Sequence, residues 1–370
     1  MGSQVTSQLV LFVFSLCFFS LISGCSQSEE ITIGAILSLS AKDGTPQLLE
    51  QEVLDGMEFA IQTLNQSSSK THQSIKLVYR DCRGEPELAK KQFRELAAMT
   101  PAIIINTYSH ITRALTPLAT EAKIPQLATV ATAGELTDNA PYSFRYWPQA
   151  SDEGAALLPI VKSLKVKMLG LINIDNEYGN SVSDTLTTMA LKENIQTQKI
   201  VFSTIDQDFV NKLIKLKKCD AILFTCFPEQ INQLAKTLRK NLPRKPLIGP
   251  NSIVSPHYVT HAILDGIHVA APLIYNEAYP YAMDIGKKYT DRYSLPLSHY
   301  SAIGYDIIIL LTQIFEEAGT TPDGILDSFN AGFVYPGLFG DVVNAKDSHD
   351  FSFPLYPAQL INKKIEFHGR

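Results

Sequence analysis

Residues 103–137 read IIINTYSHITRALTPLATEAKIPQLATVATAGELT, and this stretch decides the fold. Two apolar runs, at residues 102–105 and 126–128, are too short for helices and are predicted to be buried strands. Between them, residues 112–123 carry apolar side chains at helical spacing, which predicts an amphipathic helix. A strand, a helix and a second strand in succession indicate a parallel sheet, because parallel neighbours need a crossover connection.

Small hydroxyl side chains follow each of these predicted strands. Thr107 and Ser109 come after the first strand, and Thr129 and Thr132 come after the second. In open parallel sheets, ligands bind beyond the carboxyl ends of the strands. These two loops are therefore the first candidates for a binding site.

The beginning of the chain carries the pattern of an export signal. Residues 9–22 form an apolar run of about fourteen residues, shorter than the roughly twenty that span a bilayer. The run leads into ISGC at residues 22–25, where small residues precede a cysteine. This arrangement predicts a signal peptide over residues 1–24. It resembles the bacterial lipobox, in which Cys25 would receive a lipid.

Two other interpretations of the N-terminus stay open. A plain secretory signal would leave Cys25 unmodified, and the opening MGSQVT also fits a short myristoylation pattern. Residues 1–8 lack the Lys or Arg that signal peptides normally carry. Since only the lipobox explains both the apolar run and Cys25, we expect an extracytoplasmic protein anchored to the bacterial membrane by its N-terminal lipid. Residues 25–30 would form a polar tether.

The composition excludes several classes of function. The formal net charge is −5, and the sequence has no basic run of the kind that binds nucleic acid. The spacing of Cys and His residues matches no metal site, and no phosphate-binding loop occurs. We therefore expect neither a nucleic-acid partner, nor a metal, nor a cofactor.

The cysteines do not predict a disulfide framework. Beyond Cys25 the chain retains Cys82, Cys219 and Cys226, an odd number, so at least one is a free thiol. A bridge between Cys219 and Cys226 stays open if strand geometry allows it, but we expect two buried thiols.

Strand-like and helix-like segments alternate along the rest of the chain. Strands are expected at residues 31–37, 75–79, 168–174, 198–202, 221–225, 246–249 and 266–270, with a closing hairpin at 353–360 and 361–367. Helices are expected to open at Thr45-Pro46 and to cover residues 88–99, 151–164, 181–191, 209–217, 229–239, 279–293 and 302–318. This order predicts an α/β protein with two lobes, each built on a doubly wound parallel sheet.

Short motifs spread over about three hundred residues resemble a single family. They occur in the family's order and include ITIGAILSLS at 31–40, ATAGELT at 131–137, Tyr178-Gly179, Gly249-Pro250, Gly304-Tyr305-Asp306 and Phe339-Gly340-Asp341. On these motifs the chain resembles the leucine/isoleucine/valine-binding proteins of bacterial ABC importers, which have the type I periplasmic-binding-protein fold.

The resemblance implies two lobes joined by three hinge crossings. One lobe would comprise residues 31–147 plus 273–351, and the other residues 148–272 plus 352–370. A small polar ligand, such as an amino acid or an analogue, would be captured in the cleft by hinge closure. The closed protein, expected to be a monomer, would then deliver the ligand to the permease subunits of an ABC importer.

The resemblance also implies which residues bind the ligand. Ser109 and Thr132 would hold its amino-acid group with their hydroxyls, and Val130 would hold it with its backbone carbonyl. Tyr178 would line the cleft from the second lobe, and Tyr108 would face it from the first. Each side chain has an alternative role: a helix cap for Ser109, a local turn bond for Thr132, surface packing for Tyr178 and core packing for Tyr108.

One position of the predicted site departs from the family in charge. Asn251 follows Gly249-Pro250, where the family has an acidic residue that pairs with the ligand's ammonium group. Asn accepts hydrogen bonds without supplying a charge, so a ligand other than an α-amino acid, or none, stays open. Asp175 or Glu177 could supply the missing charge.

A second departure concerns the shape of the cleft. Cys226 and Phe227 stand where the family usually has Gly and Tyr. A thiol or a bulky ring at this place would reshape the wall of the site, and we expect Cys226 to face the ligand.

Two other functions compete with solute binding. The same fold serves as an interaction module in lipoprotein activators of penicillin-binding proteins, where the cleft would hold a different ligand or none; Ser26 after the lipidated cysteine suits outer-membrane sorting. An enzyme is the other alternative. The sequence has no Gly-x-Ser-x-Gly, Gly-x-x-x-x-Gly-Lys or His-Glu-x-x-His motif, and His257 and His261 have no evident third metal ligand. We therefore expect a binding protein and not an enzyme.

Overall fold

The computed structural model describes residues 30–66 and 74–368. The predicted signal peptide, the predicted lipidation site at Cys25 and nearly all of the predicted tether lie outside these residues. Within them, no helix is both long enough and apolar enough to cross a membrane.

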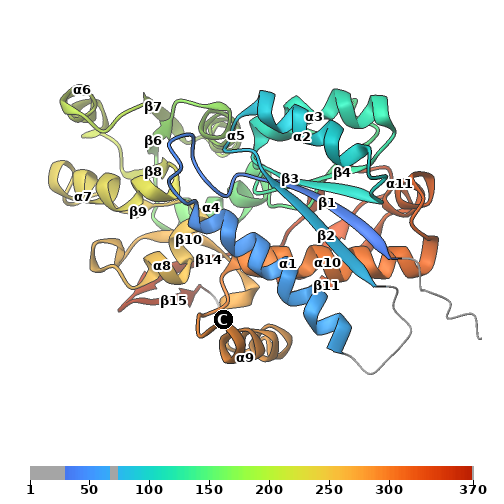
Figure 1. The fold of residues 1–370 in the computed structure, drawn as a ribbon. Coiled ribbons are helices and arrows are strands. Elements are labelled where there is room, and N and C mark those ends of the chain that lie inside the picture. Colours follow the sequence, from blue (N-terminus) through green and yellow to red (C-terminus); the bar gives the residue numbers. More distant parts are fainter. Residues whose placement is uncertain (1–29, 67–73, 369–370) are drawn as a thin grey trace, which may run out of the picture.

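The first sheet has five parallel strands in the order β2-β1-β3-β4-β5 (Figure 1). These strands are β1 (Ile31–Leu37), β2 (Ile75–Asp81), β3 (Ile103–Thr107), β4 (Gln126–Thr129) and β5 (Ser143–Arg145). Helices α2 (Pro86–Ala97) and α3 (Ser109–Ala122) cover one face of the sheet, and α1 (Leu48–Gln66) and α10 (His299–Ala318) cover the other. The first sheet is therefore doubly wound, as predicted.

The second sheet has seven strands in the order β15-β14-β10-β9-β8-β6-β7. They are β6 (Met168–Ile174), β7 (Gln196–Phe202), β8 (Ala221–Thr225), β9 (Leu247–Ile248), β10 (His268–Pro272), β14 (Leu355–Ile361) and β15 (Lys364–Phe367). The antiparallel pairs of this sheet are β10 with β14 and β14 with β15, and its other pairs are parallel. One face carries α4 (Ala150–Ser163) and α5 (Glu177–Lys192), and the other carries α6 (Gln207–Lys212), the 3-10 helix η1 (Leu213–Leu216) and α7 (Ile231–Asn241).

Smaller elements complete the two halves. A three-stranded antiparallel sheet of β11 (Phe333–Gly337), β12 (Gly340–Asn344) and β13 (Phe351–Ser352) packs into the core of the first half. The remaining elements are α9 (Pro280–Tyr293), α11 (Pro322–Ala331), α8 (Pro256–Val259) and the 3-10 helices η2 (Pro228–Gln230), η3 (Asn251–Val254), η4 (Ala262–Leu264) and η5 (Leu273–Tyr275).

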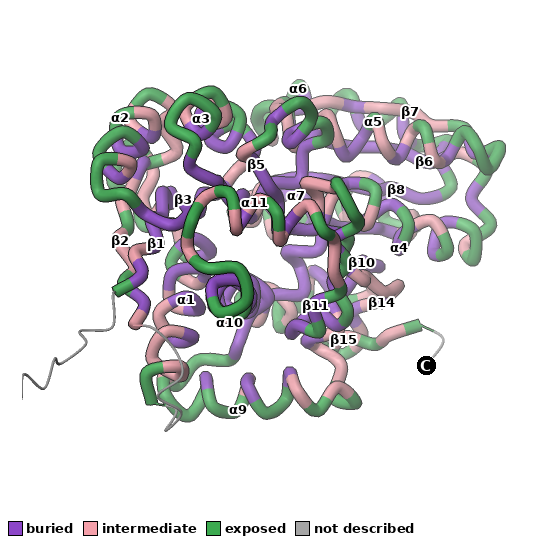
Figure 2. The backbone as a smooth tube through the Cα atoms, turned by 90° about the vertical axis from the view of Figure 1, so that its right-hand side faces the viewer, coloured by how far each residue is buried: buried purple, intermediate pink, exposed green. Residues whose placement is uncertain are grey.

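The chain passes between the two halves three times: after β5, after β10 and after β13. We call the half with the first and third sheets the first lobe, and the half with the second sheet the second lobe. Each lobe has its own hydrophobic core. Figure 2 shows the central strands buried while the outer turns of α2, α3 and α9 are exposed. This is the predicted type I architecture.

Two glycines allow a close helix contact in the first lobe. A Cβ on Gly56 of α1 would lie 1.9 Å from the Ser301 carbonyl oxygen, and a Cβ on Gly304 of α10 would lie 2.1 Å from the Val53 carbonyl oxygen. The two helix backbones therefore touch at this crossing, which only residues without a side chain permit.

Several predicted elements differ from the observed ones. Helix α3 begins at Ser109 and not at residue 112, because Tyr108 adopts a left-handed φ of 68° and turns the chain directly out of β3. The helix predicted over 209–217 is α6 followed by the tighter η1. The prediction missed β5, α11 and the third sheet. Cys219 and Cys226 are buried free thiols, as expected, and Cys82 is a third.

Candidate ligand-binding site

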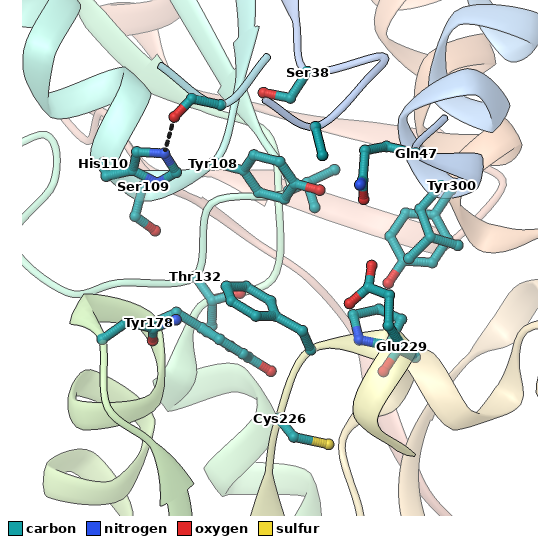
Figure 3. A pocket seen from close by; sticks show the side chains of 18 of the residues that line it. Ser38, Gln47, Tyr108, Ser109, His110, Thr132, Tyr178, Cys226, Glu229 and Tyr300 are labelled. Atoms are coloured by element: carbon teal, nitrogen blue, oxygen red, sulfur yellow. Dashed lines mark hydrogen bonds between the residues drawn. The ribbon is translucent and has the colours of Figure 1, made fainter. Parts of the chain in front are cut away.

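A cavity of about 780 Å³ lies between the two lobes (Figure 3). Its volume falls within the roughly 300–1,000 Å³ typical of small-molecule sites. Every residue predicted to bind a ligand lines it: Tyr108, Ser109, Val130 and Thr132 from the first lobe, and Tyr178, Cys226 and Asn251 from the second. The carboxyl ends of β3, β4, β6, β8 and β9 thus meet at one place, as the rule for open parallel sheets requires.

The first loop places Ser109 at the beginning of α3. Tyr108 is the N-cap residue, and no side chain among the described residues caps this helix, so the capping role for Ser109 is wrong. The Ser109 Oγ instead accepts a hydrogen bond from the backbone N–H of Ala133 at 3.2 Å. This bond ties the two loops together. A hydroxyl that accepts one bond still has a proton to donate, and Ser109 lines the cavity.

The second loop turns sharply into the cavity. Val130 has a φ of 50°, which is strained for a β-branched residue. Such strain persists only where the surrounding structure enforces it. The Thr132 Oγ1 accepts a hydrogen bond from Trp147 Nε1 at 3.0 Å, so its partner is a ring of the cavity wall and not a neighbouring turn residue.

Arg145 supports this loop from beneath, a role the sequence reasoning missed. Its side chain on β5 is fully buried and pairs with Asp350 at 2.8 Å. The guanidinium also donates to the carbonyl oxygens of Ala131, at 3.1 Å, and Ala133. The signal in the sequence was a lone arginine between the apolar rings of Phe144 and Tyr146.

Glu50 supports the first loop in a similar way. Its buried Oε2 accepts bonds from the Ser38 backbone N–H at 3.1 Å and from the Thr107 hydroxyl at 2.5 Å. Burial raises the pKa of this carboxyl to about 7, although both hydrogen bonds oppose the shift. Since Ser38 lines the cavity and Thr107 precedes Tyr108, Glu50 holds the ends of β1 and β3 in register behind the site.

Aromatic rings form much of the cavity wall. Tyr108 stacks with His110, with ring centroids 6.0 Å apart, and Trp147 stacks with Tyr300 at 5.7 Å. On the second lobe, Tyr178 stacks with Phe227 at 6.4 Å. All six rings line the cavity, so Tyr178 is a cavity residue and not a surface residue. Flat, partly apolar walls on both lobes suit a ligand that is itself partly apolar.

Two second-lobe residues of the predicted site bring no charge to it. Asn251 and Cys226 are both buried, and burial raises the pKa of the Cys226 thiol, which keeps it neutral. Of the two residues considered for the missing charge, only Glu177 lines the cavity. Glu177 is already paired with Arg113, at 2.7 Å between its Oε1 and the Arg113 Nε. The described part of the chain holds no group of three or more side chains able to bind a metal.

Polar contacts join the lobes at both edges of the cleft. Besides the pair of Arg113 and Glu177, the Gly134 backbone N–H donates to the Ser181 hydroxyl at 2.7 Å. At the other edge, His257 Nε2 lies 2.7 Å from the Glu52 carboxylate. The structure is therefore a form in which the lobes touch.

Glu153 is a buried carboxyl beneath the second-lobe wall. It lies on α4 and is 4% exposed. Burial raises the pKa of the neighbouring Tyr178, and the charge of Glu153 raises it further. Burial raises the pKa of Glu153 itself from 4.5 to about 8. A carboxyl whose pKa is higher in the folded than in the unfolded state contributes most to stability at low pH. This contribution is lost as the pH rises through the folded-state pKa.

We expect Glu153→Gln to flatten the pH dependence of stability. Between about pH 4.5 and 8, the unfolded chain loses the Glu153 proton while the folded chain keeps it. The free energy of unfolding of the wild type therefore falls with rising pH, by at most about 1.4 kcal/mol per pH unit from this group. Urea unfolding from pH 5 to pH 9 measures this. The exposed Glu121→Gln serves as control, and parallel profiles for wild type and Glu153→Gln would contradict the expectation.

A cleft between two doubly wound lobes, lined from both sides, defines the two-lobed class of binding proteins. The chain belongs to the periplasmic binding protein family, whose sequence profile matches residues 30–364. The family implies an extracytoplasmic location and a small-molecule ligand. No curated protein matches the sequence.

Solved structures share the fold at low identity. A leucine-binding protein of Thermotoga maritima is 19% identical, with a TM-score of 0.79, covering 92% of this chain and 98% of its own. A solute-binding protein of an ABC transporter from Rhodopseudomonas palustris BisB5, in complex with 3,4-dihydroxybenzoic acid, is 16% identical, with a TM-score of 0.78 and coverage of 91% and 95%. A substrate-binding protein from Desulfitobacterium hafniense in complex with Leu is 18% identical, with a TM-score of 0.77 and coverage of 92% and 100%.

Proposed function

We propose that the protein is the solute-binding component of an ABC importer. It captures a small polar ligand, such as an amino acid or an analogue, between its lobes and delivers it to the permease subunits. The observation that carries this proposal is the single cavity that all the predicted ligand-binding residues line from both lobes. The family and the solved structures that share the fold support it.

The proposed lobe boundaries follow the sheets. Residues 31–147 plus 273–351 contain every strand of the first and third sheets, with β13 ending one residue beyond. Residues 148–272 plus 352–370 contain the strands of the second sheet. Closing and opening would turn the three crossings between them, and the ligand would favour the closed form because it contacts both walls.

The proposed binding mode uses the two loops of the first lobe. The Ser109 hydroxyl, the Thr132 hydroxyl and the Val130 carbonyl would hold the polar group of the ligand, and Tyr108, Tyr178, Cys226 and Asn251 would surround the rest. A monomer anchored through a lipid on Cys25 would present the loaded cleft at the membrane. Binding and release of a ligand in this way need no catalytic group.

We expect Thr132→Ala to weaken ligand binding at least about tenfold, which corresponds to about 1.4 kcal/mol. The change removes a ligand hydrogen bond and also leaves Trp147 Nε1 without its acceptor. The ligand is first found by thermal shift of the protein from Ser26 onward with the twenty amino acids and small amides, because a ligand of the folded form raises Tm. Titration calorimetry of the hit then measures the loss.

The matched control is Thr120→Ala, which removes an exposed hydroxyl on α3 that bonds only to its own helix. It should bind as the wild type does. Equal affinities for Thr132→Ala and wild type would refute the binding mode. If no solute binds at millimolar concentration, the importer proposal fails, and the interaction-module alternative becomes the function to test by pull-down.

A further inference from the structure

The charged side chains that line the cavity differ in whether they have a partner. Lys42 pairs with Glu85 at 3.3 Å, and Glu177 pairs with Arg113. Glu229, on η2 of the second lobe, lines the cavity and makes no ion pair and receives no hydrogen bond among residues 30–66 and 74–368. Glu229 is exposed, and its charge has no partner side chain among the described residues.

The Glu229 carboxylate acts on the interior of the cavity. Burial raises the pKa of Tyr108 well above its usual value, and the charges of Glu50 and Glu229 raise it further, although Tyr108 belongs to the opposite lobe. Burial raises the pKa of Tyr258 to about 12, and Glu229 is the next contributor. In Figure 3, Glu229 lies on the side of Tyr300 and Gln47, while Ser109 lies on the opposite side.

Asp43 also lines the cavity without an ion pair, but its carboxylate accepts a hydrogen bond from the Thr45 backbone N–H at 2.9 Å. Arg83 is the remaining lining charge without an ion pair in the described chain. It stands on the turn between β2 and α2 of the first lobe, is exposed, and no ion pair joins it to Glu229. Glu229 thus has no neutralising side chain of its own in the structure.

A ligand that fills the cavity meets the Glu229 carboxylate, because Glu229 lines the cavity. Because Glu229 is exposed, a ligand that covers it removes part of its water, and that loss is unfavourable unless a partner charge or hydrogen-bond donors replace the water. A neutral apolar ligand offers neither, and an anionic group would be repelled. A cationic nitrogen compensates the charge, and the aromatic rings that line the cavity attract the same cation through their faces.

We propose that Glu229 and the aromatic rings that line the cavity bind a cationic nitrogen of the solute, at the end of the cavity away from Ser109. The polar or anionic end of the same solute would then lie at Ser109 and Thr132. The solute class is a chain or ring that separates these two groups, unlike leucine, in which they sit on one carbon. This inference rests on the proposed function and adds the specificity residue that the neutral Asn251 does not supply.

The test compares pairs of ligands that differ only in the cationic nitrogen. The pairs are L-lysine with L-norleucine, 6-aminohexanoate with hexanoate, and choline with 3,3-dimethylbutanol, each measured by titration calorimetry on the protein from Ser26 onward. We expect the cationic member of at least one pair to bind at least tenfold more tightly. In Glu229→Gln this ratio should fall to about one, and Glu229→Asp should restore part of it.

The control variant is Glu193→Gln, which removes a surface carboxylate paired with Lys162 and should leave the ratio unchanged. If the neutral members bind as well as the cationic ones, the inference is overturned while the proposed function stands. A Glu229→Gln variant that weakens both members equally also overturns it, because that result indicates a merely structural role. If none of the probes or amino acids binds, both proposals fail.

Discussion

Gly304→Ala is expected to lower the free energy of unfolding by about 3 kcal/mol or more. The added Cβ would lie 2.1 Å from the Val53 carbonyl oxygen and 3.0 Å from the Met57 backbone nitrogen. Both atoms belong to the backbone of α1, so no side chain can rotate away to make room. The two helices would have to separate, and the core of the first lobe lies between them and the sheet.

Urea unfolding of Gly304→Ala measures the expected loss, and Gly286→Ala is the matched control. Gly286 is also a helical glycine, but the nearest atom to its added Cβ is 4.0 Å away. With room for the methyl group, alanine in place of glycine should stabilise α9 by about 0.5–1 kcal/mol. If both variants have the same stability, the close contact of α1 and α10 is wrong.

Arg145→Met should cost about 3–5 kcal/mol of stability and also weaken ligand binding. The variant keeps much of the side-chain volume but leaves Asp350 without its partner and the carbonyls of Ala131 and Ala133 without a donor. Those carbonyls belong to the loop that carries Thr132. We therefore expect the loop to lose its fixed position, so that affinity falls even under conditions in which the variant stays folded.

The two effects are measured separately, by urea unfolding and by calorimetry at a temperature well below Tm. Lys162→Met is the control, because it breaks the exposed pair with Glu193 and should change stability by no more than about 1 kcal/mol. An Arg145→Met variant that is destabilised but binds the ligand like the wild type would show that the arginine serves the core alone.

Most of the fold could be predicted because its pattern is local. The apolar runs of β1, β6 and β8 were predicted with their observed bounds, since a buried parallel strand is a short apolar run between polar loops. The three residues of β5 are too few to show any period, and β13 has only two. These strands form because neighbouring strands offer hydrogen bonds, which no local pattern records.

The site was predictable where it depends on strand ends and not where it depends on distant partners. Ser109 and Thr132 follow predicted strands, so their loops could be placed together. Arg145 was missed because a charged residue indicates a surface position, unless one knows that Asp350 lies beside it. Glu229 was missed because it follows Pro228 at the start of a helical segment, where an exposed acid is ordinary.

In the proposed importer, the contacts that join the lobes affect how the solute is released. Among the described residues these contacts are few and mostly solvent-exposed. The side chains of Arg113 and Glu177 are 51% and 33% exposed, and that of His257 is 40% exposed. Exposed pairs of this kind each contribute about 0–1 kcal/mol. If these pairs are what favours the closed form over an open form, they add only a small barrier to release of the solute at the permease. Retention of the cargo then depends on the cargo's own contacts, so a poorly matched solute should escape before it is handed on.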